Sequence, residues 1–185
     1  MSSKIIFIMG VSGVGKSTIG QLLSRNLSIP FFDGDDFHPE ENIQKMAGGT
    51  PLTDQDRMAW LISLNKLALK QLSSHKRSVI VCSALKESYR DHLMHGLEKN
   101  AFWVFLYGSF EQIKERLENR SSHFMGAQML RSQFDILEVP NNALKINVSQ
   151  KPNNIVEIIK NNCEATAEFG LLGLGVMGKS LSRNL

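Results

Sequence analysis

Short apolar runs alternate with longer amphipathic segments along most of the chain. The first run, IIFIM at residues 5–9, is apolar throughout and precedes a glycine-rich turn, as expected of a strand buried on both faces of a parallel sheet. Isoleucine and leucine then recur between residues 19 and 27 at the spacing of one helix face. The pattern predicts strands at 5–9, 29–33, 78–82, 102–108 and 144–149, and helices at 19–27, 41–49, 57–72, 86–96, 110–120, 127–137 and 153–165.

This alternation predicts the fold class. Strands that alternate with helices form βαβ units, so we expect an α/β domain with a five-stranded parallel sheet and helices on both faces. Ligands of such sheets bind at the carboxyl ends of the strands, and the polar motifs of this chain fall at those ends. We assign this domain to residues 1–165 and treat residues 166–185 as a separate segment.

Composition and charge exclude several classes of protein. The chain has 185 residues and a net charge of +3, and its basic residues are scattered, which argues against a nucleic-acid-binding protein. No apolar segment approaches the roughly 20 residues of a membrane span, and residues 5–9 are too short for a secretory signal core. Cys82 and Cys163 offer neither a disulfide framework nor a metal-binding spacing. We therefore expect a cytoplasmic protein without a nucleic-acid or membrane partner.

A complete phosphate-binding motif follows the first predicted strand. The sequence GVSGVGKS matches the pattern GxxxxGK[ST] and opens a predicted helix, which is the context the motif requires. Its glycines allow a tight turn whose N–H groups point at phosphate oxygens, and the helix N-terminus adds positive charge. Lys16 can reach the β- and γ-phosphates and the Ser17 hydroxyl can hold Mg²⁺. The predicted nucleotide-binding residues here are Gly10, Val11, Ser12, Gly13, Val14, Gly15, Lys16, Ser17 and Thr18.

Two carboxylates after the second predicted strand are candidates for the chemistry. A phosphate-binding loop alone does not distinguish a kinase from a motor or a switch. The third predicted strand ends without an acid, whereas the second ends in Asp33 and continues to Asp35. On an extended segment both side chains would share one face, so Asp33 could organise Mg²⁺ while Asp35 accepts a proton from a substrate hydroxyl. The alternative is an acidic loop that faces solvent.

Three long motifs resemble the gluconokinases. They are FDGDDFHPEENIQKMAGGTPLTDQDRMAWL at 32–61, VCSALKESYRD at 81–91 and RSSHFMGAQMLRSQFDILEVP at 120–140. Gluconokinases are small P-loop kinases related in fold to shikimate kinase and the nucleoside monophosphate kinases. The resemblance covers about residues 5–160. It implies transfer of the γ-phosphate of ATP to the 6-hydroxyl of D-gluconate, with Mg²⁺ as cofactor, and a homodimer.

The resemblance also implies roles for individual residues. Gluconate is an anion, so cations near its carboxylate are expected, and Arg57 stands where shikimate kinases place a carboxylate-binding arginine. His38 could hydrogen-bond a sugar hydroxyl, or it could be a structural hydrogen-bond donor. Surface salt bridges are the alternative role for the cations. The predicted substrate-binding residues are Asp35, His38, Arg57, Lys86, Arg90 and His123.

The segment around residues 120–125 resembles a mobile lid. Arg116 and Arg120 lie one helical turn apart before it, and either could reach over the phosphates; we favour Arg120 as the catalytic one because it is nearest the lid. Many relatives carry a glycine just before the lid histidine, where this chain has Ser122. Other readings stay open: another small-molecule or nucleotide kinase of the same fold, a nucleotide-dependent module without turnover, or a dinucleotide-binding protein.

The end of the chain carries a second glycine-rich turn. Gly173, Gly175 and Gly178 form the pattern GxGxxG within FGLLGLGVMGKSLSRNL, which resembles the start of 6-phosphogluconate dehydrogenases. That enzyme consumes the product of a gluconokinase, so the resemblance implies a joint between two consecutive enzymes or a truncated gene product. We predict that residues 166–185 bind no dinucleotide by themselves, because a lone strand and half a helix lack the rest of the sheet.

Overall fold

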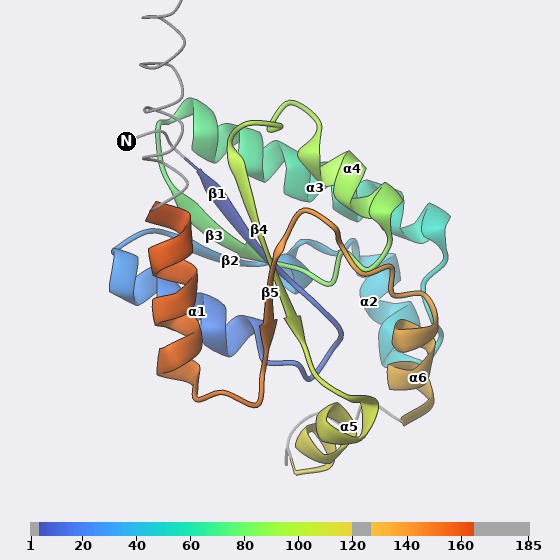
Figure 1. The fold of residues 1–185 in the computed structure, drawn as a ribbon. Helices are drawn as coiled ribbons and strands as arrows, with labels where there is room; N and C mark the ends of the chain where they lie inside the picture. The colour runs from blue at the N-terminus through green and yellow to red at the C-terminus, as the bar shows by residue number, and fades with distance from the viewer. Residues whose placement is uncertain (1–3, 120–126, 165–185) are drawn as a thin grey trace, which may run out of the picture.

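A five-stranded parallel sheet forms the centre of the molecule. The computed structural model describes residues 4–119 and 127–164 of the chain. The strands run in the spatial order β2-β3-β1-β4-β5, and every pair is parallel. Figure 1 shows β1 at the middle of the sheet. The strands are β1 Ile5–Met9, β2 Phe31–Asp33, β3 Ser78–Val81, β4 Ala101–Tyr107 and β5 Leu144–Asn147. The predicted fold class is confirmed.

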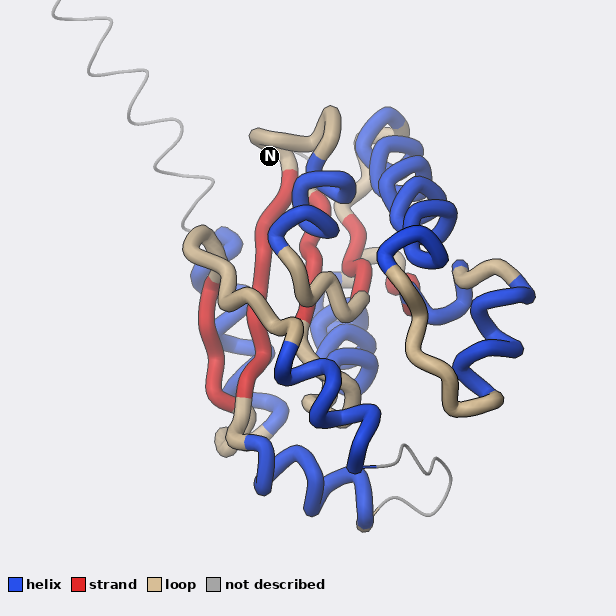
Figure 2. Tube along the Cα trace, turned by 90° about the vertical axis from the view of Figure 1, so that its right-hand side faces the viewer, coloured by secondary structure: helices blue, strands red, loops and turns tan. Residues whose placement is uncertain are grey.

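Helices cover both faces of the sheet, as Figures 1 and 2 show. α1 and the helix at residues 152–164 lie on one face, and α3 and α4 lie on the other. The named helices are α1 Lys16–Leu27, α2 Glu40–Ala47, α3 Asp54–Ser73, α4 Glu87–Met94, α5 Phe110–Glu118 and α6 Ala127–Asp135, and the short 3₁₀ helix η1 spans Gly34–Phe37. The helices predicted from apolar spacing are therefore present, with bounds that differ by a few residues.

The hydrophobic core has two halves, one on each face of the sheet. All five residues of β1 are fully buried, and their side chains alternate between the halves. Ile6 and Ile8 pack with α1, whereas Ile5 and Phe7 pack with α3 and α4. Phe7 also stacks on Trp103 with ring centroids 4.6 Å apart. Burial on both sides explains why the sequence of β1 is apolar throughout instead of alternating.

The chain after β2 differs from the sequence prediction. We expected an extended segment that carries Asp33 and Asp35 on one face, but the backbone turns into η1 directly after Asp33. Asp33 caps η1 by accepting a hydrogen bond from the Asp35 backbone N–H at 3.2 Å. Gly34 allows the turn to lie against β3, because an added Cβ would sit 2.6 Å from the Val81 carbonyl oxygen. The prediction of a shared extended face is therefore wrong, and capping explains why.

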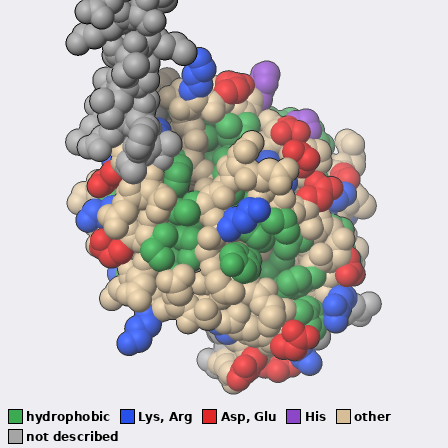
Figure 3. Space-filling view, viewed as in Figure 1, with side chains coloured by type: hydrophobic (Ala, Val, Ile, Leu, Met, Phe, Trp, Pro, Cys, Tyr) green, Lys and Arg blue, Asp and Glu red, His purple; other side chains and the backbone are tan. Residues whose placement is uncertain are grey.

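The surface and the cysteines add little chemistry of their own. Figure 3 shows basic side chains scattered among acidic ones on the face it draws, without a continuous basic area among the described residues. None of the helices in the described part of the chain has the length and apolar character that crossing a bilayer requires. Cys82 and Cys163 are free and buried. Burial raises the pKa of the Cys82 thiol to about 12, so this residue is a packed apolar group and not a nucleophile.

Candidate active site

The phosphate-binding motif forms a loop between β1 and α1. Gly10, Gly13 and Gly15 have φ values of 143°, 79° and 102°, which side chains other than glycine rarely adopt. Gly10 also lies against the Leu106 carbonyl oxygen, so a Cβ would not fit there. α1 begins at Lys16 without a side-chain hydrogen bond at its N-cap, Gly15. The loop therefore presents backbone N–H groups and a helix N-terminus to an anion.

Lys16 and Ser17 lie at the start of α1, beside the acids that follow β2. The Lys16 ammonium donates a hydrogen bond to the Val11 carbonyl at 3.1 Å, which holds its side chain along the loop. The Ser17 hydroxyl donates to Asp33 Oδ2 at 2.6 Å. This contact joins the phosphate-binding loop to the end of β2, two segments that lie 16 residues apart in the sequence. The two candidate metal-binding residues thus lie together.

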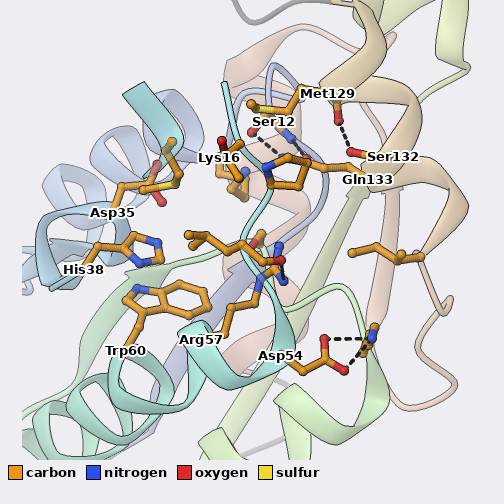
Figure 4. A pocket seen from close by; sticks show the side chains of 17 residues that line it. Ser12, Lys16, Asp35, His38, Asp54, Arg57, Trp60, Met129, Ser132 and Gln133 are labelled. Atoms are coloured by element: carbon orange, nitrogen blue, oxygen red, sulfur yellow. Dashed lines mark hydrogen bonds and ion pairs between the residues drawn. The ribbon is translucent and has the colours of Figure 1, made fainter. Parts of the chain in front are cut away.

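A cleft of about 250 Å³ opens beside the loop, as Figure 4 shows. Lys16 and Asp35 line its phosphate end, and Arg57 and Lys86 line its far end, here called the acceptor end. Asp35 faces the cleft, whereas Asp33 is hydrogen-bonded to Ser17. The structure therefore gives the two carboxylates different surroundings. The lining residues are Ser12, Lys16, Asp35, His38, Met46, Thr50, Pro51, Leu52, Asp54, Arg57, Trp60, Ser83, Lys86, Met129, Ser132, Gln133 and Ile136.

His38 and Trp60 form one wall of the cleft. Their rings stack with centroids 4.5 Å apart and an interplanar angle of 9°, as is visible in Figure 4. The Trp60 indole N–H donates to the Gly34 carbonyl at 2.7 Å, which fixes the ring. Burial lowers the pKa of His38 below its usual 6.5, the Asp35 charge raises it and the Arg57 charge lowers it. His38 is therefore a neutral imidazole at pH 7, suited to exchanging hydrogen bonds with a hydroxyl.

Two cations and one carboxylate meet at the acceptor end. Lys86 Nζ lies 2.8 Å from each carboxylate oxygen of Asp54. This ion pair holds the pKa of Asp54 below its usual value and raises the pKa of Lys86. Arg57 donates to the Leu52 carbonyl and, at 3.5 Å, to the Tyr89 hydroxyl. With one of the two cations paired to Asp54, the acceptor end keeps a net positive charge, which is suited to an anionic substrate.

The structure places Arg90 and Arg116 outside this cleft. Arg90 is 9% exposed, and its guanidinium donates to the Ala84 and Leu85 carbonyls at 3.0 and 3.1 Å. In this conformation Arg90 supports the loop before Lys86 instead of facing a ligand. Arg116 donates to the Val148 carbonyl at 2.5 Å and lines a second pocket on the other side of the phosphate-binding loop.

The second pocket was not expected from the sequence. It lies between the loop and the start of the helix at 152–164, and it shares no lining residue with the cleft. Its lining combines apolar side chains with one guanidinium, one amide and one hydroxyl. The lining residues are Gly13, Val14, Gly15, Thr18, Ile19, Arg116, Val148, Gln150, Pro152 and Ile155. Arg120 and His123 lie outside the described residues, as do the lid motif and residues 165–185.

Sequence reasoning also missed a contact between α6 and the loop. The Gln133 side chain accepts from the Ser12 backbone N–H at 2.7 Å and donates to the Ser12 hydroxyl at 3.1 Å. This amide fixes the loop from a helix 121 residues away in the chain. The only signal in the sequence was a polar pair, Ser132 and Gln133, within an otherwise amphipathic segment, and that pattern does not identify a partner.

The chain is similar to known kinases over most of its length. The family model described as shikimate kinase matches residues 12–157. The thermoresistant gluconokinase of Escherichia coli (strain K12) is 42% identical over 164 residues, which cover 84% of this chain and 93% of that protein. The gluconokinase of Arabidopsis thaliana is 38% identical over 181 residues, with coverages of 88% and 95%. The chain belongs to the gluconokinase family.

Solved structures agree with this family. The crystal structure of a gluconokinase from Sinorhizobium meliloti 1021 matches with a TM-score of 0.75 at 37% identity, over 97% of this chain and 98% of that one. Shikimate kinase from Aquifex aeolicus matches with a TM-score of 0.54 at 21% identity, which supports the fold alone. The resemblance predicted from the three motifs is confirmed at the level of the family. The resemblance of residues 166–185 to a dehydrogenase stays a prediction.

Proposed function

We propose that this gluconokinase-family chain transfers the γ-phosphoryl group of ATP to the 6-hydroxyl of D-gluconate, giving 6-phosphogluconate and ADP. The observation that carries the proposal is the cleft itself, in which one continuous lining joins Lys16 and Asp35 to Arg57 and Lys86. A site with a phosphate-binding loop at one end and two cations at the other suits a phosphoryl acceptor that is itself an anion. The relatives named gluconokinase support gluconate as that acceptor.

The phosphate end would bind and orient the nucleotide. The loop N–H groups and the α1 N-terminus would hold the phosphates, and Lys16 would lie beside the group being transferred. The adenine base of the nucleotide would lie in the second pocket, since Thr18 and Arg116 line this pocket beside the loop. We place Arg120 and His123 over the phosphates from their sequence positions alone.

The surroundings of Ser17 and Asp33 fit Mg²⁺. Their oxygens lie 2.6 Å apart at the phosphate end, and Mg²⁺ is commonly held by one or two protein oxygens together with substrate phosphates and water. No group of three or more His, Cys, Asp or Glu within residues 4–119 and 127–164 could hold a metal by itself, which suits an ion that arrives with the nucleotide. When bound, Mg²⁺ would neutralise charge on the phosphate oxygens.

Asp35 is the proposed general base. Its carboxylate would take the proton of the 6-hydroxyl as the hydroxyl oxygen forms a bond to the γ-phosphorus. The bond between that phosphorus and the β–γ bridging oxygen breaks, and ADP leaves with its electron pair. Asp33 is less suited to this task, because it already accepts hydrogen bonds from Ser17 and from the Asp35 backbone.

The acceptor end would orient gluconate. Arg57 and Lys86 would face its carboxylate, and neutral His38 would hydrogen-bond a hydroxyl along the carbon chain. Arg90 would act indirectly, through the loop that carries Lys86. This arrangement would distinguish an acid from a neutral sugar by charge.

The proposal also covers the assembly of the chain, its location and residues 166–185. We propose that the chain works as a cytoplasmic homodimer and that residues 166–185 are the start of a 6-phosphogluconate dehydrogenase-like domain, so that the kinase would be one part of a bifunctional enzyme. The proposed catalytic groups lie between Gly10 and Arg120. A chain that ends at Glu164 should therefore keep its kinase activity, and neither form should bind NADP at millimolar concentration.

Measurement of ADP release with several acceptors tests the function. Gluconate, shikimate, nucleoside monophosphates and glucose would each be offered with ATP and Mg²⁺, and the phosphorylated product would be identified by mass spectrometry. We expect turnover with gluconate to exceed turnover with every other acceptor by at least a hundredfold. Preferred turnover of shikimate or of a nucleotide would contradict the proposal and support another kinase of the same fold.

A further inference from the structure

Tyr89 on α4 lies at the centre of the acceptor end without lining the cleft. Its side chain is 4% exposed and packs in the core half that contains Trp60 and Leu93. Its hydroxyl emerges from that core among charged groups, where it donates to the Asp54 carboxylate and accepts from Arg57 at 3.5 Å. The residue therefore connects a rigid apolar core to three charged side chains of the cleft.

Both cations of the acceptor end lie against the same ring. The Arg57 guanidinium carbon is 5.6 Å from the centroid of the Tyr89 ring, and Lys86 Nζ is 5.5 Å from it. Contacts of this kind with an aromatic ring attract a cation and limit its positions. Since Arg57 belongs to α3 and Lys86 precedes α4, the ring fixes the separation of two cations that come from different elements.

Asp54 completes this arrangement. It is the first residue of α3, and a capping box between Thr53 and Asp56 fixes the start of that helix. Its carboxylate holds the Lys86 ammonium, but its side chain is 63% exposed, and exposed ion pairs impose little order by themselves. The hydroxyl of a buried tyrosine adds a fixed anchor to this exposed pair.

We propose that Tyr89 is the positioning residue of the acceptor end, which holds Arg57, Lys86 and Asp54 in the geometry that receives the carboxylate of a sugar acid. This inference rests on the proposed function and deepens it, because it assigns the preference for an acid to a residue that does not touch the substrate. Long, flexible cations gain specificity when their positions are fixed before binding.

Tyr89→Phe and Tyr89→Leu test the proposal in steady-state kinetics with gluconate and ATP. Phe keeps the ring and removes the hydroxyl, so we expect the KM for gluconate to rise about five- to tenfold, by the usual contribution of a single hydrogen bond. Leu also removes the ring, so its KM should rise further, to roughly thirtyfold or more. The KM for ATP should stay within about twofold of wild type in both variants, because the phosphate-binding loop is unchanged.

The chain supplies a matched control in its one other tyrosine. Tyr107 is 40% exposed at the end of β4 and lines neither pocket, so Tyr107→Phe should leave both KM values unchanged. A double-mutant cycle with Arg57→Lys adds a second measurement. If Tyr89 acts through Arg57, the fold-increase of the KM for gluconate in the double variant will be smaller than the product of the fold-increases in Tyr89→Phe and Arg57→Lys.

Two results would overturn the inference. An unchanged KM for gluconate in Tyr89→Phe would show that the hydroxyl positions nothing. A parallel rise in both KM values together with a lower Tm would show that Tyr89 only stabilises the fold. Failure of the proposed function is distinguishable, because then the wild-type chain itself would not phosphorylate gluconate, and both proposals would fall together.

Discussion

The two ends of the cleft are built in different ways. Apart from Asp35 on η1, the phosphate end comes from one continuous stretch, residues 10–18, whose backbone N–H groups are held by glycine conformations and by a helix terminus. The acceptor end comes from side chains of α3, from Lys86 in the loop before α4 and from His38 just after η1. The first kind of site is recognisable in a short motif. The second kind depends on long side chains whose positions other residues must fix.

This difference predicts which changes do the most harm. Removal of a charge at the phosphate end should abolish turnover of any acceptor, because the transferring group itself loses its stabilisation. Changes at the acceptor end should instead alter binding of the acid while nucleotide binding persists. The following predictions are ordered from the largest expected effect to the smallest.

Lys16→Ala should have the largest effect. The variant removes the cation beside the transferring phosphoryl group, so we expect kcat to fall at least about a hundredfold, as for other electrostatic stabilisers of a transition state. Thermal denaturation should show a folded protein. The control is Lys66→Ala, which removes the same charge from an exposed lysine on α3. This variant should keep wild-type turnover. Near-wild-type turnover in a folded Lys16→Ala would remove the loop from the mechanism.

Asp35→Asn and Asp33→Asn should give different phenotypes. Asp35→Asn removes the proposed base, so kcat should fall by about two to four orders of magnitude while the affinity for ATP stays close to normal. Asp33→Asn weakens an oxygen ligand beside Ser17, so the Mg²⁺ concentration for half-maximal rate should rise. Magnesium titrations of both variants check this division of roles. Identical phenotypes would contradict it.

Arg57→Lys should act on the acid and spare the nucleotide. The substitution keeps the charge but loses the planar group that contacts Leu52, Tyr89 and the cleft at once. We expect the KM for gluconate to rise about tenfold and the KM for ATP to change little. Initial rates at varied gluconate and varied ATP separate the two constants. If the wild-type chain phosphorylated glucose as well as gluconate, recognition of the carboxylate would be refuted.

His38→Gln should have the smallest effect, which is a change in how the Tm depends on pH. Burial lowers the pKa of His38 in the folded chain below 6.5, so the unfolded chain binds a proton more readily. The contribution of neutral His38 to the free energy of unfolding is thus fully present above pH 6.5. It is lost as the pH falls through the lowered pKa of the folded chain. His38→Gln should show a smaller drop in Tm between pH 7.5 and pH 5.5 than wild type. His92→Gln, an exposed histidine on α4, should show the wild-type drop.

Local sequence patterns predicted most of the fold. The inner strands β1, β3 and β4 were expected because most of their residues are apolar at successive positions, and burial on both faces of the sheet produces that pattern directly. The path after β2 was not expected, because the turn into η1, which Asp33 caps, also brings Gly34 against Val81 of the neighbouring strand. The pattern of residues within one segment does not predict a contact with another segment.

The same division holds for the candidate site. Lys16, Asp35, His38, Arg57 and Lys86 were predicted from motifs, and the structure places all five along one cleft. Asp54, Tyr89 and Gln133 were missed although they stand inside the quoted motifs, since their roles come from partners that are distant in the sequence. Arg90 was assigned to the substrate by its type and position, but its side chain faces backbone carbonyls.

By itself the sequence determined the strands and helices, their order along the chain and the phosphate-binding loop, and the resemblance of three long motifs indicated the family. The strands, the helices and the loop depend on periodic burial, on glycine conformations and on backbone groups, all of which act over a few neighbouring residues. Only the tertiary structure decided that Asp33 pairs with Ser17, that His38 stacks on Trp60, and that one buried tyrosine contacts both acceptor-end cations. Each of these contacts joins segments brought together by the packing of helices on the sheet, and that packing is a property of the whole chain.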